Sequence, residues 1–128
     1  MNPTQLAIFG SFRKGLDCCV QIYPVRHEAA AIRTPFRDFA GDFLEIYVTR
    51  EGKVTDGGGT LNLFHSLRCY QDYLDYPFRA DFLSRYNINE EFGEMVCTDL
   101  SPCGILLYAQ GLSKLRGMFE AHPYGEEA

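Results

Sequence analysis

Three acidic residues in the first half of the chain have the type and spacing that metal-dependent hydrolysis requires. Asp42 and Glu45 lie at the start of an apolar stretch, and Asp56 precedes a run of glycines. Two adjacent strands could bring these carboxylates around a divalent cation, as in a metal-dependent nuclease or hydrolase. The lysine that a restriction-type nuclease carries two positions after its strand acid is missing, because Tyr47 stands there. We favour the simpler interpretation, in which Asp42 caps a turn, Glu45 faces water and Asp56 closes an Asx turn. We therefore expect no bound metal and no other cofactor.

The glycine run 57–59, followed by Thr60, is a second candidate for chemistry. Backbone amides before a helix can cradle a phosphate group. The segment lacks the Gly-Lys-Ser/Thr ending of a P-loop and the spacing of a dinucleotide fingerprint. Turn chemistry alone therefore favours a strand exit followed by a helix with Thr60 as its N-cap.

The thiols and imidazoles give a weaker signal. Cys69 and His65 stand four residues apart on an expected helix, which is formally a nucleophile and its base, but no third orienting group is evident. The chain has five cysteines, no Cys-x-x-Cys pair, and an adjacent pair at Cys18 and Cys19. An odd number without regular spacing is typical of a reduced cytosolic protein with buried thiols.

A tyrosine-rich segment is the best candidate for a contact with another molecule. Tyrosine joins apolar area to a polar tip and is favoured at interfaces. Acidic residues between such rings suit a basic partner. The predicted contact surface comprises Tyr70, Asp72, Tyr73, Asp75 and Tyr76, with Glu90, Glu91 and Glu94 as a second acidic patch. The alternative is that the rings pack on the sheet and the acids are solvated.

Composition limits the classes of protein that these residues can serve. The chain has 128 residues and a formal net charge of −5. This length suits one domain, which we expect over residues 1–123 with a tail at 124–128. The acidic balance disfavours direct nucleic-acid binding, which needs clustered Lys and Arg. No apolar run is long enough to span a membrane, and the N-terminal residues lack a signal-peptide pattern, so we expect a cytoplasmic protein.

Hydrophobic periodicity predicts the elements that position these residues. Apolar alternation predicts strands over 18–24, 29–36, 43–49, 54–56 and 94–98, with a tight turn at 51–53. Helical spacing predicts helices over 4–16 and 60–67, from Pro77, and from Ser101-Pro102 to about His122. Because the elements do not alternate as βαβ units do, we expect an α+β fold. Its small antiparallel sheet would pack against N-terminal, central and C-terminal helices.

The sequence contains a strand motif followed by a turn motif. The residues of these motifs are Thr34, Pro35, Phe36, Asp38, Asp42, Ile46, Tyr47, Val48, Thr55, Asp56 and Thr60. With them the chain resembles, over roughly residues 20–120, an uncharacterised family of phages and bacterial mobile elements, the domain of unknown function numbered eighteen-twenty-eight. The second Asp of the family's turn motif is Gly57 here, so half of any acidic pair is missing. The resemblance implies a genetic context rather than a reaction.

Three hypotheses follow for the function. The first is a non-enzymatic interaction protein that binds and modulates a host protein complex, such as a CRISPR or other defence effector, by analogy with the genetic context. The second is the metal-dependent hydrolase of Asp42, Glu45 and Asp56. The third is a small regulatory homodimer that pairs through an edge strand at Ala29 to Ile32.

Overall fold

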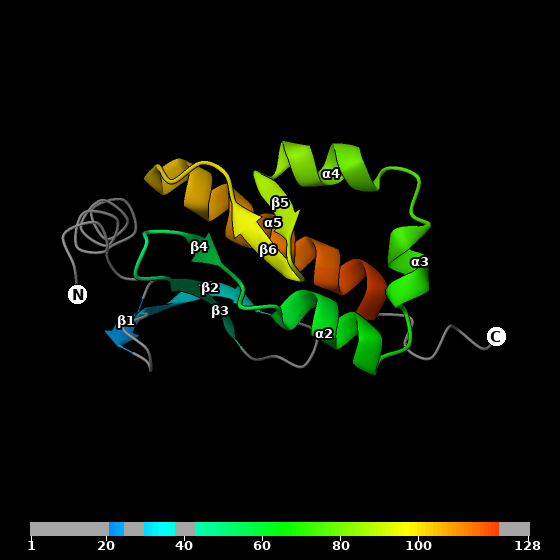
Figure 1. The fold of residues 1–128 in the computed structure, drawn as a ribbon, viewed down its shortest axis with the longest axis horizontal. Coiled ribbons are helices and arrows are strands. Elements are labelled where there is room, and N and C mark those ends of the chain that lie inside the picture. Colours follow the sequence, from blue (N-terminus) through cyan, green and yellow to red (C-terminus); the bar gives the residue numbers. More distant parts are fainter. Residues whose placement is uncertain (1–20, 25–29, 38–42, 121–128) are drawn as a thin grey trace.

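The computed structural model describes residues 21–24, 30–37 and 43–120, and Figure 1 shows its fold. The expected helix over 4–16, Cys18, Cys19, Asp38, Asp42 and the expected tail at 124–128 lie outside the described residues. The elements in chain order are β1 (Gln21–Pro24), β2 (Ala30–Arg37), β3 (Phe43–Val48), β4 (Val54–Thr55), α2 (Gly59–Ser66), α3 (Tyr70–Leu74), α4 (Arg79–Arg85), β5 (Ile88–Glu91), β6 (Glu94–Cys97) and α5 (Pro102–Glu120).

The strands form one antiparallel sheet in the order β1-β2-β3-β4-β6-β5, which confirms the expected α+β fold. The turn at 51–53 joins β3 to β4, where the Thr49 amide donates to the Lys53 carbonyl at 2.8 Å. Gly52 takes a positive φ of 86° in this turn. Glycine adopts that conformation without the steric cost that a side chain brings.

Alternation along β3 places two kinds of side chain on the two faces of the sheet. Leu44, Ile46 and Val48 are buried, whereas Phe43 is exposed and Glu45 is half-buried. The register pairs Ile32 with Ile46 and Arg33 with Glu45. Directly paired residues share a face, so the apolar pair and the charged pair lie on opposite sides of the sheet.

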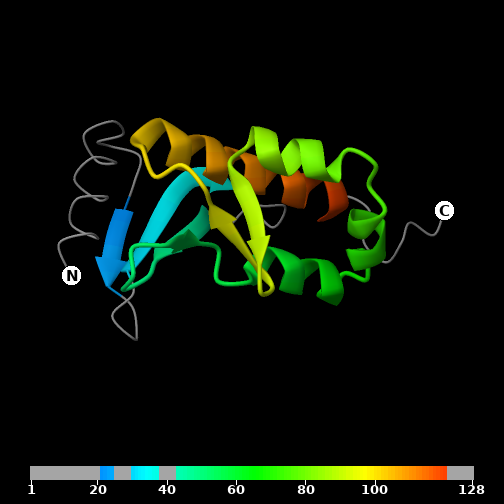
Figure 2. The ribbon, with the colours of Figure 1, turned by 45° about the horizontal axis from the view of Figure 1, so that its top comes forward.

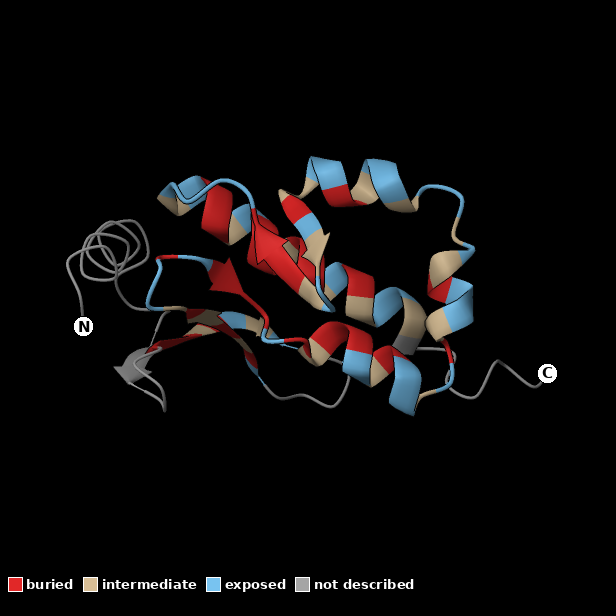
Figure 3. Cartoon of the chain, viewed as in Figure 1, coloured by how far each residue is buried: buried red, intermediate tan, exposed pale blue. Residues whose placement is uncertain are grey.

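Helix α5 covers the apolar face of the sheet (Figures 1 and 2). Its buried stripe recurs at helical spacing and comprises Ile105, Tyr108, Ala109, Leu112 and Leu115. These side chains join those of β2, β3 and β6 in a single core, which runs through the middle of the molecule in Figure 3. The start of α5 is as predicted, because the Ser101 hydroxyl accepts the Gly104 amide at 3.0 Å. No helix in the described part of the chain is long and apolar enough to cross a membrane.

The smaller helices begin at different residues from those expected. Thr60 lies inside α2 rather than at its N-cap, which is Gly58 in the left-handed conformation. The helix start is shifted because the Asp56 carboxylate, rather than the Thr60 hydroxyl, accepts the first backbone amides, those of Gly58 and Thr60. Helix α4 begins at Arg79, two residues after Pro77, and the tyrosine-rich segment forms the separate short helix α3.

The sequence interpretation missed strand β5 and misplaced one sheet edge. Ile88–Glu91 pairs with β6 in a hairpin, whereas only the second strand of that pair was expected. Strand β2 is not an edge, because Ala30, Ala31 and Ile32 pair with β1 on one side and with β3 on the other. The homodimer contact predicted at Ala29 to Ile32 is therefore unavailable within the described residues.

Candidate functional site

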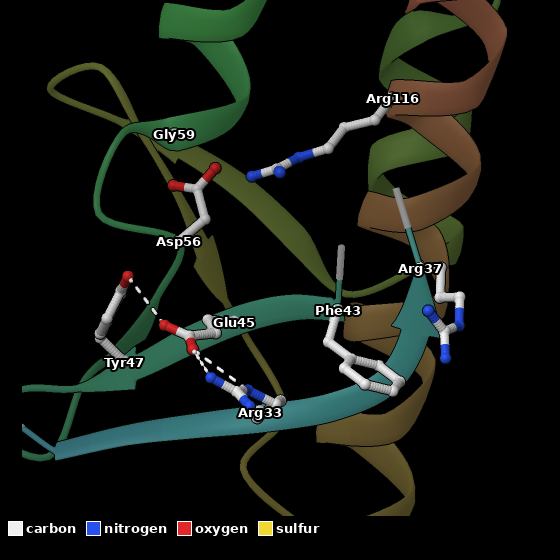
Figure 4. Close-up of a pocket in the computed structure, with 8 residues that line it drawn as sticks. All are labelled: Arg33, Arg37, Phe43, Glu45, Tyr47, Asp56, Gly59 and Arg116. Atoms are coloured by element: carbon white, nitrogen blue, oxygen red, sulfur yellow. Dashed lines mark hydrogen bonds and ion pairs between the residues drawn. The ribbon is translucent and has the colours of Figure 1, made fainter. Parts of the chain in front are cut away.

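A pocket of about 640 Å³ opens on the charged face of the sheet. Strands β2 and β3 form one wall, the start of α2 forms another, and α5 contributes one long side chain (Figure 4). Its lining residues are Arg33, Arg37, Phe43, Glu45, Tyr47, Asp56, Gly59 and Arg116. Two of the three acids singled out from the sequence, Glu45 and Asp56, are among them. Asp42, the third, lies outside the described residues.

Sheet register holds the charged pair of this pocket in place. Arg33 and Glu45 are directly opposite on β2 and β3, and Arg33 Nη2 lies 3.2 Å from Glu45 Oε2. The Tyr47 hydroxyl, two residues along β3, donates to Glu45 Oε1 at 3.5 Å. Burial raises the pKa of Tyr47, and the neighbouring Glu45 carboxylate adds to this rise. Glu45 thus has protein partners on both oxygens and is less open to water than expected.

The Asp56 carboxylate is buried and is satisfied by the backbone. Its Oδ1 accepts the Gly58 amide at 2.8 Å and the Met95 amide at 3.0 Å, and its Oδ2 accepts the Thr60 amide at 3.0 Å. Asp56 is only 3% exposed. The Asx turn is confirmed by the bond to Gly58, and Asp56 also joins this turn to strand β6.

This arrangement corrects the idea of a phosphate cradle at Gly57 to Thr60. A cradle needs backbone amides that point at an incoming anion. Here the carboxylate of Asp56 already occupies the amides of Gly58 and Thr60 at the start of α2. The described residues also contain no group of three or more His, Cys, Asp or Glu side chains that could hold a metal ion.

Arg116 brings a third guanidinium group to the pocket from a distant part of the chain. Its Nε donates to the Thr60 hydroxyl at 3.0 Å, and Figure 4 shows the side chain reaching from α5 toward Asp56. Among the described residues Arg116 forms no ion pair within 4.0 Å. Arg37, at the end of β2, lies with its guanidinium carbon 4.2 Å from the centre of the Phe43 ring. The sequence interpretation noticed none of these arginines, because they are far apart along the chain.

The tyrosine-rich segment is divided between core and surface. Tyr73 is fully buried, its ring centre lies 5.2 Å from that of Phe64, and its hydroxyl donates to Glu90 Oε1 at 2.8 Å. Burial raises its pKa, and the bond to Glu90 contributes. Tyr73 therefore has no surface to offer a partner, which corrects its place in the predicted contact. Tyr70 is half-buried and stacks on His65 at 4.1 Å.

The remaining residues of that predicted surface do reach solvent. Tyr76 is half-buried beside Phe78, at a ring distance of 5.9 Å. Asp72 and Asp75 are exposed, and Asp75 accepts the Gln71 side chain at 3.0 Å. The solvated acids that the alternative interpretation expected are therefore present, next to rings that pack against the fold.

The three glutamates of the predicted second acidic patch all lie in the β5–β6 hairpin, and each has a partner. Glu90 pairs with Arg79 at 3.2 Å, and Glu91 pairs with Lys53 at 3.3 Å. Glu94 accepts the Thr55 hydroxyl at 2.5 Å. Two of the three charges are thus balanced by a nearby base, and the patch is less acidic than the sequence suggests.

Phe92 is the residue of greatest functional interest that the sequence interpretation missed. It forms the tip of the β5–β6 hairpin with Gly93, and its relative exposure is 101%. Both tip residues have positive φ, 49° for Phe92 and 81° for Gly93, as a type I′ turn requires. In the sequence only Gly93 marks this turn, because an aromatic before glycine is not among the pairs that a type I′ turn prefers.

The described thiols do not have the surroundings of an activated nucleophile. Cys97 is buried, and this burial raises its pKa to about 11. Cys69 is also buried, whereas Cys103 is exposed. His65, the formal partner that the sequence offered for Cys69, stacks on Tyr70.

Comparisons with protein-family models, with curated proteins and with solved structures found no match to this chain. The resemblance drawn from the strand and turn motifs therefore stays a prediction.

Proposed function

We propose that the chain is a non-enzymatic interaction protein that inserts Phe92 into an apolar pocket of a partner protein. The observation that carries this proposal is a fully exposed aromatic ring on a backbone that disfavours it. A non-glycine residue at positive φ is costly, and a solvated ring returns no packing energy to the fold. The same ring would contribute strongly to affinity once a partner covers it.

The charges next to Phe92 define the rim of the partner's pocket. Glu91 and Glu94 flank the tip, and of the two only Glu91 is paired with a lysine, Lys53. The tip therefore carries a net negative charge close to its apolar anchor. A partner pocket rimmed by Lys or Arg would complement this charge and speed the encounter.

We propose a bacterial host as the source of the partner. The motif resemblance to a family of phages and mobile elements supports a host protein complex as the target, and inhibition as the effect. A defence effector, such as a CRISPR nuclease, is the first complex to test. The interaction would take place in the host cytoplasm.

Photo-crosslinking tests the proposed anchor directly. The phenylalanine analogue para-benzoylphenylalanine would replace Phe92 in one variant and Phe78 in a matched control. Phe78 suits this purpose because, among the residues that the structure describes, it is the most exposed aromatic after Phe92, at 64%, and it lies outside the hairpin. We expect ultraviolet light to link the first variant to one partner in bacterial lysate and to leave the control unlinked. Equal labelling by both variants would reject the anchor.

The surface of α3 provides the competing location for the contact. A variant with Asp72→Lys and Asp75→Lys reverses the two exposed charges that the sequence interpretation singled out. We expect this variant to retain the partner that Phe92→Asn loses. The reverse pattern would move the contact to α3. A crosslink between two copies of the chain would instead establish a regulatory homodimer.

A further inference from the structure

We infer that the groove between α4 and β5 binds an extended peptide segment of another protein, which adds a strand to the sheet. The groove has a volume of about 470 Å³, a size typical of ligand clefts. Figures 1 and 2 show the helix running beside the strand, and residues of both elements line the groove. Phe92 is not among them, so this inference goes beyond the proposed function and can fail without it.

Strand β5 lies at one edge of the sheet. Among the described strands it pairs with β6 on one side and with none on the other. The groove follows this edge, because its lining includes Ile88, Asn89 and Glu90, and successive residues of a strand point to opposite faces. Helix α4 covers the edge without pairing with it, since the backbone groups inside a helix bond to one another. The main chain of β5 is therefore what the groove presents to a ligand.

The hairpin register identifies which main-chain groups of β5 are open. The Thr98 amide donates to the Asn87 carbonyl at 2.9 Å, so these two residues form a hydrogen-bonded pair. Bonded and non-bonded pairs alternate along antiparallel strands. Ile88 and Glu90 therefore belong to non-bonded pairs, and their amides and carbonyls turn away from β6. Within the described part of the chain these main-chain groups form no hydrogen bond.

Met95 supports this orientation independently. It lies opposite Glu90 on β6. Its amide donates to the Asp56 carboxylate at 3.0 Å, and its carbonyl accepts the Asp56 amide at 3.2 Å, on the side of β6 where β4 ends. The main chain of Met95 thus faces away from β5. The two outward-facing residues of β5 offer two amides and two carbonyls, which is the pattern that an added extended strand recognises.

The walls of the groove leave room for an apolar segment. Leu83 on α4 and Ile88 on β5 are almost fully buried and form an apolar floor. Ala80 and Ser84 lie one turn apart on the same face of α4, and both are exposed. Their short side chains leave space for a second backbone beside β5. We therefore expect a peptide with apolar side chains at alternate positions, one of which packs on this floor.

Charge does not select an acidic or a basic peptide at this place. The charged residues in the described lining are Arg79 and Glu90, which form an ion pair at 3.2 Å. The groove is thus formally neutral in a chain whose net charge is −5. Main-chain pairing and burial of apolar area are the sources of affinity that remain, so the bound segment is uncharged where it lies in the groove.

A second copy of the chain suits the groove less well than a peptide does. Edge strands of two copies can pair about a two-fold axis. Here α4 ends at Arg85 and β5 begins at Ile88, with two residues between them. A second copy would therefore bring its own α4 to the groove together with its β5. A single extended segment carries no such helix.

Selection from a phage-displayed library of random heptapeptides, with the full chain as bait, tests the groove. We expect enriched peptides to have apolar residues at alternate positions. Ser84→Trp fills the groove with a large side chain and should weaken binding of a synthetic enriched peptide about tenfold or more. Arg85→Trp is the matched control, because Arg85 is the next residue of α4, is exposed, and does not line the groove.

Two outcomes of that experiment would overturn the groove. One is a failure to enrich any peptide on the unmodified chain over the Ser84→Trp chain. The other is an equal loss of binding in Ser84→Trp and Arg85→Trp. Circular dichroism verifies that each variant is folded. If Ser84→Trp does not fold, Ala80→Trp takes its place, with Asp81→Trp as its control.

Amide hydrogen exchange, measured by nuclear magnetic resonance with the synthetic peptide, tests the strand pairing itself. In the free chain the amides of Ile88 and Glu90 should exchange faster than those of Asn89 and Glu91, which face β6. Saturating peptide should slow the first two about tenfold or more and change the other two little. Protection elsewhere, with none at Ile88 and Glu90, would overturn strand addition. Protection without peptide that rises with chain concentration would assign the edge to a second copy and overturn the peptide.

Discussion

The turn at Asp56 and the turn at Phe92 are neighbours with the same left-handed backbone conformation, but their side chains have opposite surroundings. A methyl group on Gly58 would lie 3.4 Å from the carbonyl oxygen of Gly93, so the two turns touch. Gly57 and Gly58 take positive φ in the first turn, and Phe92 and Gly93 take it in the second. In the first turn a buried carboxylate binds three amides, whereas in the second the side chain is wholly in solvent.

This difference separates a structural polar residue from a candidate recognition residue. Asp56 has the residue type of a catalytic group, yet its carboxylate accepts three backbone amides and so has a structural role. Phe92 has the residue type of a core group, yet it contributes no packing to the fold. Residue type alone therefore favours Asp56 as the functional residue, whereas the contacts of the two side chains favour Phe92 as the candidate for recognition.

The largest effect that tests this comparison is the loss of the Asp56 carboxylate. Asp56→Ala would leave the amides of Gly58, Thr60 and Met95 without an acceptor in a buried place. We expect a loss of about 4–5 kcal/mol in the free energy of unfolding, because each of the three bonds to a carboxylate contributes about 1.5 kcal/mol or more. Urea denaturation of both proteins measures it.

Asp72→Ala is the matched control for that experiment. Asp72 is exposed in the first turn of α3, so its removal should change stability by about 0.5 kcal/mol or less. Similar losses in the two variants would show that Asp56 does not have the structural role described above.

The second-largest effect concerns the pH dependence of stability at Cys97. This residue is the last of strand β6, at the end that lies away from the exposed turn and in the core. The folded chain holds the Cys97 proton up to a pH of about 11, because burial raises its pKa from 9.0. Between these values the native state binds more protons than the unfolded state. Stability present below pH 9 is therefore lost as the pH rises to 11, by on the order of 2–3 kcal/mol.

Denaturation at a series of pH values checks this prediction. Burial also raises the pKa of Tyr73 and of Tyr108, so both tyrosines add to the loss above pH 10. Cys97→Ala should be less stable at pH 7 and should lose less stability between pH 9 and 10. Parallel pH profiles for the two proteins would contradict the assignment to Cys97.

Local patterns predicted the fold better than the site. The alternation of β3 and the apolar stripe of α5 each reflect burial of one face, and both elements formed where expected. Strand β5 was missed because Asn89, Glu90 and Glu91 are polar, and because Glu90 and Glu91 make contacts with groups far away in sequence, Tyr73 and Lys53. A short strand at a sheet edge needs little apolar alternation, so periodicity does not detect it.

The pocket was partly predictable for a related reason. Glu45 and Asp56 were identified from adjacent strands, and the structure does bring both to one pocket. The arginines that change its chemistry come from β2 and from a helix that begins 46 residues after Asp56, at Pro102. Only the packing of α5 against the sheet places Arg116 there, and no spacing in the sequence encodes that contact.

The smallest effect is a gain in stability rather than a loss, and it tests the role of Phe92 directly. Asn is the residue that a type I′ turn prefers before glycine, because its short side chain tolerates positive φ. Phe92→Asn should therefore stabilise the fold, by about 0.5–1 kcal/mol, since the solvated ring makes no contact to lose. Gly93→Ala, at φ 81° with open space around it, should destabilise the same turn by about 1 kcal/mol. Thermal unfolding of both variants measures the two signs. If Phe92→Asn stabilises the chain and no longer retains the partner that the crosslink identifies, Phe92 serves a partner rather than the fold, whereas destabilisation by Phe92→Asn would show that the ring serves the fold.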